Sequence, residues 1–266
     1  MQGKERLDKV LVEKGLVEGR ERAKALILAG KVFVDGTIIN KAGTKVSSSS
    51  DIKIKQNSSS YVSRGGEKLE GFFKTFPLDL KDKIAMDIGA STGGFTHFLL
   101  ERGVKKVYAI DVGYGQLDWH LRNDPRVINM EKVNIRYLDP SMIKDRINLA
   151  TIDVSFISLE LVLPLVLRLL AQNGEVIALI KPQFEVGKEE VEKKGIIRDK
   201  TKHKKVLLKI AQLSKKIGWK VKGMMRSPLL GAKGNIEFFI YLSSSKDSSD
   251  REDIETYIDN IINNPL

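Results

Sequence analysis

The chain has 266 residues, of which 45 are Lys or Arg and 34 are Asp or Glu, so its formal net charge is +11. A positive charge of this size favours a polyanionic partner, either nucleic acid or an acidic membrane. The absence of cysteine excludes disulfides, thiolate metal sites and a cysteine nucleophile. The three histidines are too widely spaced for a histidine-rich metal site, so we expect no metal.

No segment is typical of a membrane span or a signal peptide. The longest apolar run, residues 157–170, is interrupted by Glu160, Pro164 and Arg168 and falls short of the ~20 residues that cross a bilayer. Residues 1–6 are charged and are not followed by an apolar stretch. We therefore expect a cytoplasmic protein that acts without a membrane.

Composition divides the chain into two domains and a tail. Residues 47–50 and 56–60 are rich in serine, and the second stretch indicates a flexible connector. We expect a small domain at residues 1–56, a linker at 57–62, a large domain at 63–243 and a C-terminal tail at 244–266. The sequence does not decide whether this tail is a docked helix or a loose end.

The small domain begins with two predicted helices and a hairpin. Apolar residues at helical spacing predict helices over residues 6–14 and 19–29, and Gly15 ends the first. Residues 32–39 predict two short strands around an Asp35-Gly36 turn. Basic side chains on these helices either contact the phosphates of a polyanionic partner or only solvate the surface. With one residue from the large domain, the candidate RNA-binding residues are Arg6, Arg20, Arg22, Lys24 and Arg64.

Nearly all of the small domain resembles the S-four-like RNA-binding domain of ribosomal proteins and tyrosyl-tRNA synthetases. The matching motifs are Arg6-Leu7-Asp8, Arg20…Arg22-Ala23 and Gly30-Lys31-Val32…Val34-Asp35-Gly36. The resemblance implies a small α+β domain that binds structured RNA by its shape and backbone more than by its bases.

The large domain alternates strands with helices, a pattern that predicts an α/β fold with a parallel sheet covered on both faces. Polar residues stand at the ends of five predicted strands, and we expect them to lie together because ligands bind at the carboxyl edge of such sheets. These residues are Asp87, Asp111, Asn134, Asp153 and Lys181. The strands are predicted at residues 83–88, 106–110, 126–132, 149–152 and 175–180, with closing strands at 219–225 and 236–242.

A glycine-rich turn follows the first of these strands, with Gly89, Gly93 and Gly94 in a spacing that matches neither the dinucleotide fingerprint nor a P-loop. Asp111, some 20 residues farther on, suits the two hydroxyls of a ribose. An adenosine without pyrophosphate fits this pattern better than NAD, so we expect S-adenosylmethionine as the ligand. The alternative is that the glycines only permit tight packing. The candidate cofactor-binding residues are Asp87, Gly89, Ser91, Gly93, Gly94, Phe95, Asp111 and Asn134.

The residues after the fourth strand narrow the choice of methyl acceptor. Enzymes that methylate a base amine usually carry Asn/Asp-Pro-Pro-Phe/Tyr there, whereas this chain has Asp153-Val154-Ser155-Phe156. Methylation of a pyrimidine carbon usually needs a cysteine, which is missing. A ribose hydroxyl instead needs a base, and a buried lysine oriented by carboxylates can serve. Lys68, Asp153, Lys181 and Glu237 are the candidate catalytic residues, and the alternative for each of them taken alone is a surface charge.

Residues 4–242 resemble the TlyA (hemolysin-A-like) family of ribosomal RNA 2′-O-methyltransferases, because several long motifs occur in the same order. The large domain also resembles the FtsJ/RrmJ-like enzymes. The motifs are Ser63-Arg64-Gly65-Gly66-x-Lys68-Leu69, Asp87-Ile88-Gly89-Ala90-Ser91-Thr92-Gly93-Gly94-Phe95-Thr96, Asp111-Val112-Gly113-Tyr114-Gly115-Gln116-Leu117, Asp153-Val154-Ser155-Phe156-Ile157-Ser158 and Lys181-Pro182-Gln183-Phe184-Glu185. The resemblance implies a Rossmann-like class I methyltransferase sheet, a Lys68-Asp153-Lys181-Glu237 tetrad, and a cytidine ribose in ribosomal RNA or ribosomal subunits as target.

Two other functions remain open at this stage. The chain could be a catalytically inactive RNA-binding factor for ribosome assembly, a possibility that the unbroken glycine turn argues against. It could also be a membrane-active hemolysin, although it has no strongly amphipathic apolar stretch of the kind such proteins need. The charged residues 185–199 are expected to form either a mobile lid or a solvated loop.

Overall fold

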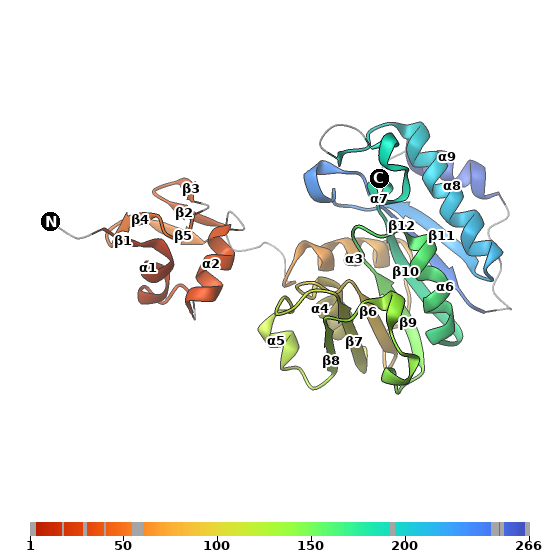
Figure 1. Ribbon diagram of the computed structural model, residues 1–266, viewed down its shortest axis with the longest axis horizontal. Coiled ribbons are helices and arrows are strands. Elements are labelled where there is room, and N and C mark those ends of the chain that lie inside the picture. The colour runs from red at the N-terminus through yellow and green to blue at the C-terminus, as the bar shows by residue number, and fades with distance from the viewer. Residues whose placement is uncertain are drawn as a thin grey trace. The chain divides into compact units, whose positions relative to one another are not determined.

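The computed structural model describes residues 4–17, 19–28, 31–39, 41–54, 61–191, 195–245, 250 and 253–263. Its contacts divide the chain into two units, residues 1–60 and 61–266 (Figure 1). The predicted linker at 57–62 lies outside the described residues as far as residue 60, while Tyr61 and Val62 belong to the second unit.

The first unit packs two helices on short antiparallel strands. The predicted hairpin is present, and Asp35 and Gly36 both take positive φ (49° and 81°), as a two-residue turn between twisted strands requires. Leu7, Leu11 and Ile27 are fully buried in its own apolar core. The elements are β1 (Lys4–Arg6), α1 (Leu7–Glu13), α2 (Arg20–Leu28), β2 (Val32–Val34), β3 (Thr37–Ile39), β4 (Lys45–Ser47) and β5 (Ile52–Ile54).

The second unit is built on a seven-stranded sheet in the order β11-β12-β10-β9-β6-β7-β8. Its strands are β6 (Ile84–Ile88), β7 (Lys106–Asp111), β8 (Val127–Glu131), β9 (Ile147–Ile152), β10 (Leu170–Ile180), β11 (Lys220–Arg226) and β12 (Phe238–Ser243). Its helices are α3 (Arg64–Thr75), α4 (Gly94–Glu101), α5 (Trp119–Arg122), α6 (Leu159–Leu169), α7 (Pro182–Glu185), α8 (Lys200–Lys216) and α9 (Ile254–Asn263).

The expectation of a parallel sheet needs one correction, because β12 runs antiparallel to both of its neighbours. Its first residue, Phe238, pairs with Ile180, the last residue of β10. The residue before β12, Glu237, therefore lies at the same edge as the carboxyl ends of the parallel strands. The strand also begins two residues later than predicted, at Phe238 instead of Ile236, so Glu237 precedes it.

Helices cover both faces of the sheet, which confirms the predicted α/β fold (Figure 1). Alternate strand residues point to opposite faces, as the pleat requires. Ile88, Ile110 and Ile152 pack on the side of α6, α8 and α9. Val107 and Leu179 pack on the other side, with α3 and α4. The carboxyl edge of the sheet is left open between these layers.

The last described helix, α9, answers the question about the tail. It packs against α8 and the edge strand β11, with Ile258 fully buried in the main core. The Tyr257 hydroxyl donates to the Met224 carbonyl at 2.6 Å, and it accepts from the Met224 amide at 3.2 Å. The tail is thus docked over residues 254–263. Within the described part of the chain, no helix has the length and apolarity needed to cross a membrane.

Candidate active site

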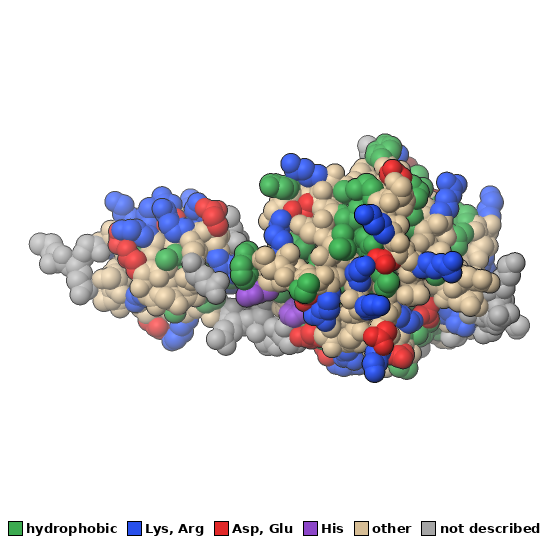
Figure 2. Space-filling model, turned by 90° about the horizontal axis from the view of Figure 1, so that it is seen from below, with side chains coloured by type: hydrophobic (Ala, Val, Ile, Leu, Met, Phe, Trp, Pro, Cys, Tyr) green, Lys and Arg blue, Asp and Glu red, His purple; other side chains and the backbone are tan. Residues whose placement is uncertain are grey.

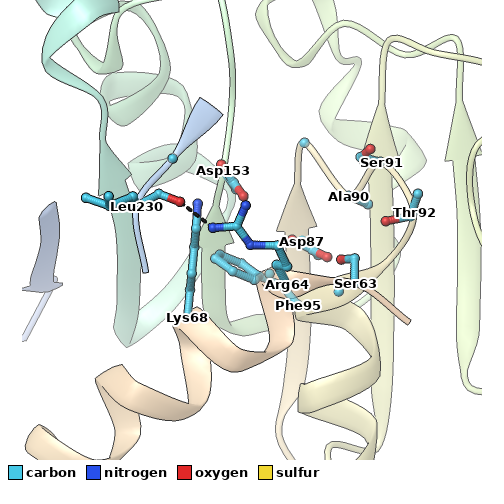
Figure 3. Close-up of a pocket in the computed structure, with 14 residues that line it drawn as sticks. Ser63, Arg64, Lys68, Asp87, Ala90, Ser91, Thr92, Phe95, Asp153 and Leu230 are labelled. Carbon is cyan, nitrogen blue, oxygen red and sulfur yellow. Dashed lines mark hydrogen bonds between the residues drawn. The ribbon is translucent and has the colours of Figure 1, made fainter. Parts of the chain in front are cut away.

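A pocket opens at the carboxyl edge of the sheet, between the start of α3, the glycine turn after β6 and the loop before β12 (Figure 3). Lys68 and Asp153, which are 85 positions apart in the sequence, both line it. In the close-up, their side chains extend from different elements toward the same space. The pocket also contains Arg64, Asp87 and Phe95.

Lys68 and Glu237 form a buried ion pair, with 2.6 Å between Nζ and Oε2. Their side chains are only 10% and 3% exposed, so the pair is shielded from water. Lys68 lies one helical turn after Arg64 on α3, and Glu237, the residue before the reversed strand β12, supplies the carboxylate. Gly231 packs so closely on Glu237 that a Cβ there would stand 1.8 Å from Oε1.

Lys181 and Asp153 form a second ion pair, with 2.6 Å between Nζ and Oδ1. The Lys181 amine also donates to the Ser155 hydroxyl at 3.0 Å. These residues follow β10 and β9, which are neighbouring parallel strands, so the pairing results directly from the topology. The four candidate catalytic residues therefore occur as two lysine–carboxylate pairs at one edge of the sheet.

Gly89 brings the turn after β6 close to the end of β9. Its φ is +84°, and a Cβ would stand 2.5 Å from the Asp153 carbonyl oxygen. Only glycine fits both the positive φ and this approach. The candidate cofactor residue Gly89 thus also fixes where Asp153 lies.

Asp87 lies within β6 and is almost fully buried. Its carboxylate accepts hydrogen bonds from the Thr96 amide (3.0 Å), the Thr96 hydroxyl (2.7 Å) and the Thr151 hydroxyl (3.0 Å). Burial raises the pKa of Asp87 to about 6, above its ordinary 3.8, although these bonds oppose the shift. The residue organises the start of α4 and also borders the pocket.

A second pocket, of about 650 Å³, adjoins the first and lies within the size range of small-molecule sites. Asp111 lines it at the end of β7, where its carboxylate accepts from the amides of Ser91 (2.8 Å) and Gly113 (2.7 Å). Asn134 lines it from the start of the 3₁₀ helix at Ile135–Tyr137. Gly89, Ser91 and Asp153 line both pockets, so one extended ligand can occupy the two.

Of the other candidate cofactor residues, some line a pocket and one serves the packing of the fold. Gly94 and Phe95 border the first pocket, and Phe95 is buried. Gly93 caps α4 with φ +92°, and a Cβ there would collide with Leu121 at 2.3 Å. Gly93 does not belong to the described lining of either pocket, so its observed part is packing.

The candidate RNA-binding arginines have internal partners. In the first unit, Arg6 and Arg20 are about half exposed and both donate to the fully buried Asp8. The hydrogen bond from Arg6, opposed in part by burial, lowers the pKa of Asp8 to about 2. Lys24 pairs with Glu21 at 2.6 Å, and Arg22 is exposed. In the second unit, Arg64 donates to the Leu230 carbonyl at 2.5 Å (Figure 3).

Sequence reasoning did not single out three contributors to the site, namely Ser155, Phe156 and the Leu230–Gly231 backbone. Phe156 is 90% exposed, takes φ 63°, and packs its ring on Phe184 at 4.9 Å. Positive φ is rare for a bulky side chain, so this backbone is strained. The Asp153–Ser158 motif contained the first two residues, whereas no local signal identified the loop before β12.

The charged segment at 185–199 is partly docked in the described residues. Ile197 is buried, its amide donates to the Asn235 side chain at 3.0 Å, and its carbonyl lies 3.1 Å from the His203 ring. Residues 192–194 lie outside the described part of the chain. Neither a free lid nor a fully solvated loop describes residues 195–198.

Two segments of the chain match known protein families. Residues 61–244 match the family described as FtsJ-like methyltransferase, and residues 5–52 match the S4 domain. The matches fall one in each unit of the structure.

Three relatives are similar over almost the whole chain. The candidate rRNA methyltransferase YqxC of Bacillus subtilis is 50% identical over 90% of this chain and 85% of its own. The 16S/23S rRNA (cytidine-2′-O)-methyltransferase TlyA of Mycobacterium tuberculosis is 42% identical over 91% of each chain. A solved candidate hemolysin from Streptococcus thermophilus is 43% identical, with a TM-score of 0.76, covering 98% of this chain and 95% of that one.

Proposed function

Because the chain belongs to the FtsJ-like methyltransferase family and carries an S4 domain, we propose that it methylates the 2′-hydroxyl of a cytidine in ribosomal RNA. The observation that carries the proposal is the convergence of two lysine–carboxylate pairs beside the glycine turn. Relatives named for cytidine 2′-O-methylation of rRNA support the choice of target. We also propose that the reaction takes place in the cytoplasm.

S-adenosylmethionine is the methyl donor in this proposal, and it supplies a methyl group on a positively charged sulfur. The adjoining pockets fit it, since Asp111 and Asn134 line the wider one and Asp87 lines the other. Each Asp111 oxygen holds one backbone amide and keeps a lone pair for a ribose hydroxyl. The Asp87 carboxylate is placed to attract the donor's ammonium group.

Lys181 is the proposed base. Lys181 carries a proton in its ion pair with Asp153 and has to release it before the reaction. Transfer then forms an O–CH₃ bond, breaks the S–CH₃ bond and releases the hydroxyl proton, which the Lys181 amine takes up. Asp153 and Ser155 fix the position of that amine, and a positioned base typically contributes a factor of ~10²–10⁴ in rate. Lys68, fixed by Glu237, contributes positive charge beside the forming bond.

The acceptor nucleotide is proposed to reach the pocket past Phe156, whose exposed ring offers a surface for a base to stack on. Arg64 at the pocket and Arg6, Arg20, Arg22 and Lys24 in the first unit are proposed to contact the RNA backbone. Figure 2 shows Lys and Arg side chains gathered on part of the first unit and spread over the second.

A methyl-transfer assay with Lys181→Ala tests this function. The wild-type protein is expected to transfer labelled methyl groups from S-adenosylmethionine to ribosomal RNA taken from cells that lack it. The variant should bind the donor normally but transfer at least ~10²-fold more slowly. Mapping of blocked 2′-hydroxyls identifies the nucleotide.

Lys83→Ala is the matched control, because Lys83 also forms a partly buried ion pair, with Glu175 at 2.5 Å, at the amino end of the strands. It should leave the rate per folded molecule unchanged. If wild-type protein leaves every 2′-hydroxyl unmodified, the alternative of an inactive assembly factor replaces this proposal. Normal turnover by Lys181→Ala would remove Lys181 from the mechanism.

A further inference from the structure

Two turns run side by side at the carboxyl edge of the sheet, one after β9 (Asp153–Ser158) and one after β10 (Lys181–Glu185). Their contacts follow the order of the residues. Lys181 holds Asp153 and Ser155, and the Phe184 ring packs on Phe156. The last contact in this order is made by Glu185.

Glu185 holds the far end of the first turn with both of its carboxylate oxygens. Oε2 accepts from the Ser158 hydroxyl at 2.6 Å, and Oε1 accepts from the Leu159 amide at 2.9 Å. Glu185 is only 6% exposed, and burial raises the pKa of its carboxyl. Its charge lies at the first turn of α6, where amide groups without helical partners favour an anion.

The turn between these anchors contains the strained Phe156. Its φ of 63° is unfavourable for an aromatic residue, and 90% of its surface is exposed, so burial of this ring contributes little to holding the turn. The fixed points of the turn are then Asp153 and Ser155 on one side and Ser158 on the other. The Asp153 amide is also held, since it donates to the Ile88 carbonyl at 2.9 Å. We expect loss of the Ser158 side to let the backbone of residues 155–158 relax and to shift the Asp153 and Ser155 side chains that meet Lys181.

We propose that Glu185 is a positioning residue, which holds the Asp153–Ser158 turn in register with the Lys181–Glu185 turn and so keeps Asp153 and Phe156 in place. This inference rests on the proposed function, because it assigns Glu185 a part in the same transfer. Glu185 does not belong to the described lining of either pocket, so in this proposal it acts through Ser158 and Leu159.

Two substitutions separate positioning from general stability. Glu185→Ala removes both acceptors and is expected to lower kcat by roughly 10- to 100-fold, with the KM for S-adenosylmethionine unchanged, since small misplacements of reacting groups have effects of this size. Glu185→Gln keeps an oxygen for the Leu159 amide and offers its own amide to Ser158, so it should restore most of the rate. If Glu185→Ala does not fold, Ser158→Ala removes one of the two bonds to Glu185, together with the N-cap bond from the Glu160 amide, and should show a smaller loss of kcat of the same kind.

Glu160→Ala is the matched control, since it removes another carboxylate from the first turn of α6, one that pairs with Lys209 at 2.6 Å. It should leave kcat unchanged. In a double-mutant cycle, Glu185→Ala should have little further effect once Asp153 is Ala, because residues acting as a unit are not additive. A normal kcat in Glu185→Ala, an equal loss in Glu160→Ala, or full additivity would each overturn the inference.

Amide hydrogen exchange keeps this inference separate from the proposed function. In Glu185→Ala, the amides of residues 154–159 should lose protection against exchange, whether or not the protein methylates RNA. The protection of the strands should be unchanged. If the wild-type protein is inactive but Glu185→Ala loses this protection, the proposed function fails, while the inference that Glu185 holds the turn stands. If wild-type protein is active and protection is unchanged, the inference alone fails.

Discussion

The buried carboxylate of Asp87 lowers the stability of the fold at neutral pH, and the same charge is proposed to attract the ammonium group of the donor. Its pKa of about 6, against 3.8 in the unfolded chain, means that folding disfavours the charged form. A shift of this size corresponds to ~3 kcal/mol. The stability that the protonated group contributes is complete below pH 3.8 and is lost as the pH rises through about 6. At neutral pH the protein therefore maintains an unfavourable buried charge beside the pocket.

Asp87→Asn is expected to raise the free energy of unfolding at pH 7 by up to ~3 kcal/mol and to weaken S-adenosylmethionine binding at least tenfold. The amide preserves the shape of the side chain and keeps an acceptor for Thr96, but it cannot attract an ammonium group. Calorimetric titration from pH 5 to 8 should show wild-type affinity falling as the pH drops below about 6 and a flat profile for the variant.

Asp145→Asn is the control for Asp87. That carboxylate pairs with Lys106 and Tyr108, whose hydrogen bonds lower its pKa, so its stability contribution has the opposite sign and is lost as the pH falls. Its substitution should not affect donor binding. Unchanged affinity in Asp87→Asn would show that Asp87 only organises the turn through Thr96 and Thr151.

The sequence could predict those site residues that follow a predicted strand. Asp111, Asp153 and Lys181 follow predicted parallel strands, so one topological rule places all three at one edge. Phe156 and Leu230 could not be found this way. The part played by Phe156 depends on exposure and a positive φ, and that of Leu230 on a carbonyl group, which every residue carries.

At the scale of elements, most strands and helices of the large domain were predicted closely because their apolar patterns are long, but β10 begins at Leu170 instead of residue 175 and the helix α3 was not predicted. The strands β1 and β4 have three residues each, and unlike the equally short β2 and β3 they are not joined by an Asp-Gly turn that marks their place. The helix α3 contains Gly65, Gly66 and Gly71, which lower helix propensity, yet it forms because Leu69 and Phe72 are buried against the sheet. The reversal of β12 has no local signal at all.

The element α9 is expected to stabilise the second unit without taking part in transfer. Ile258→Ala should lower the free energy of unfolding by ~2–5 kcal/mol, because it opens a cavity in the main core under α8 and β11. Ile261→Ala, at a half-buried position on the same helix, should cost less. Denaturant unfolding measures both effects, and kcat per folded molecule should equal that of the wild type. A loss of kcat in the folded Ile258 variant would show that α9 reaches the site.

At the scale of the whole molecule, the positive charge is shared between two units with separate cores. Cations of the first unit that contact RNA phosphates release counterions, so they contribute to affinity in a salt-dependent way. Lys68 and Lys181 of the second unit are paired with carboxylates at the active-site edge of the sheet, and in the proposed function they act on the reaction rather than on RNA binding. Affinity for RNA and the rate of transfer should therefore respond to different substitutions.

A variant with Arg6→Gln, Arg20→Gln and Asp8→Asn tests this division. The Asp8 change is included because an unpaired buried carboxylate would destabilise the first unit. RNA binding should weaken, and the slope of log K against log salt should fall in magnitude by roughly 1–2, as expected for two lost phosphate contacts. At saturating RNA, kcat should be unchanged. Lys53→Gln makes the same net change in charge at a lysine paired with Asp51, and it should leave the slope nearly intact. An unchanged slope in the triple variant would show that this arginine pair does not contact the RNA.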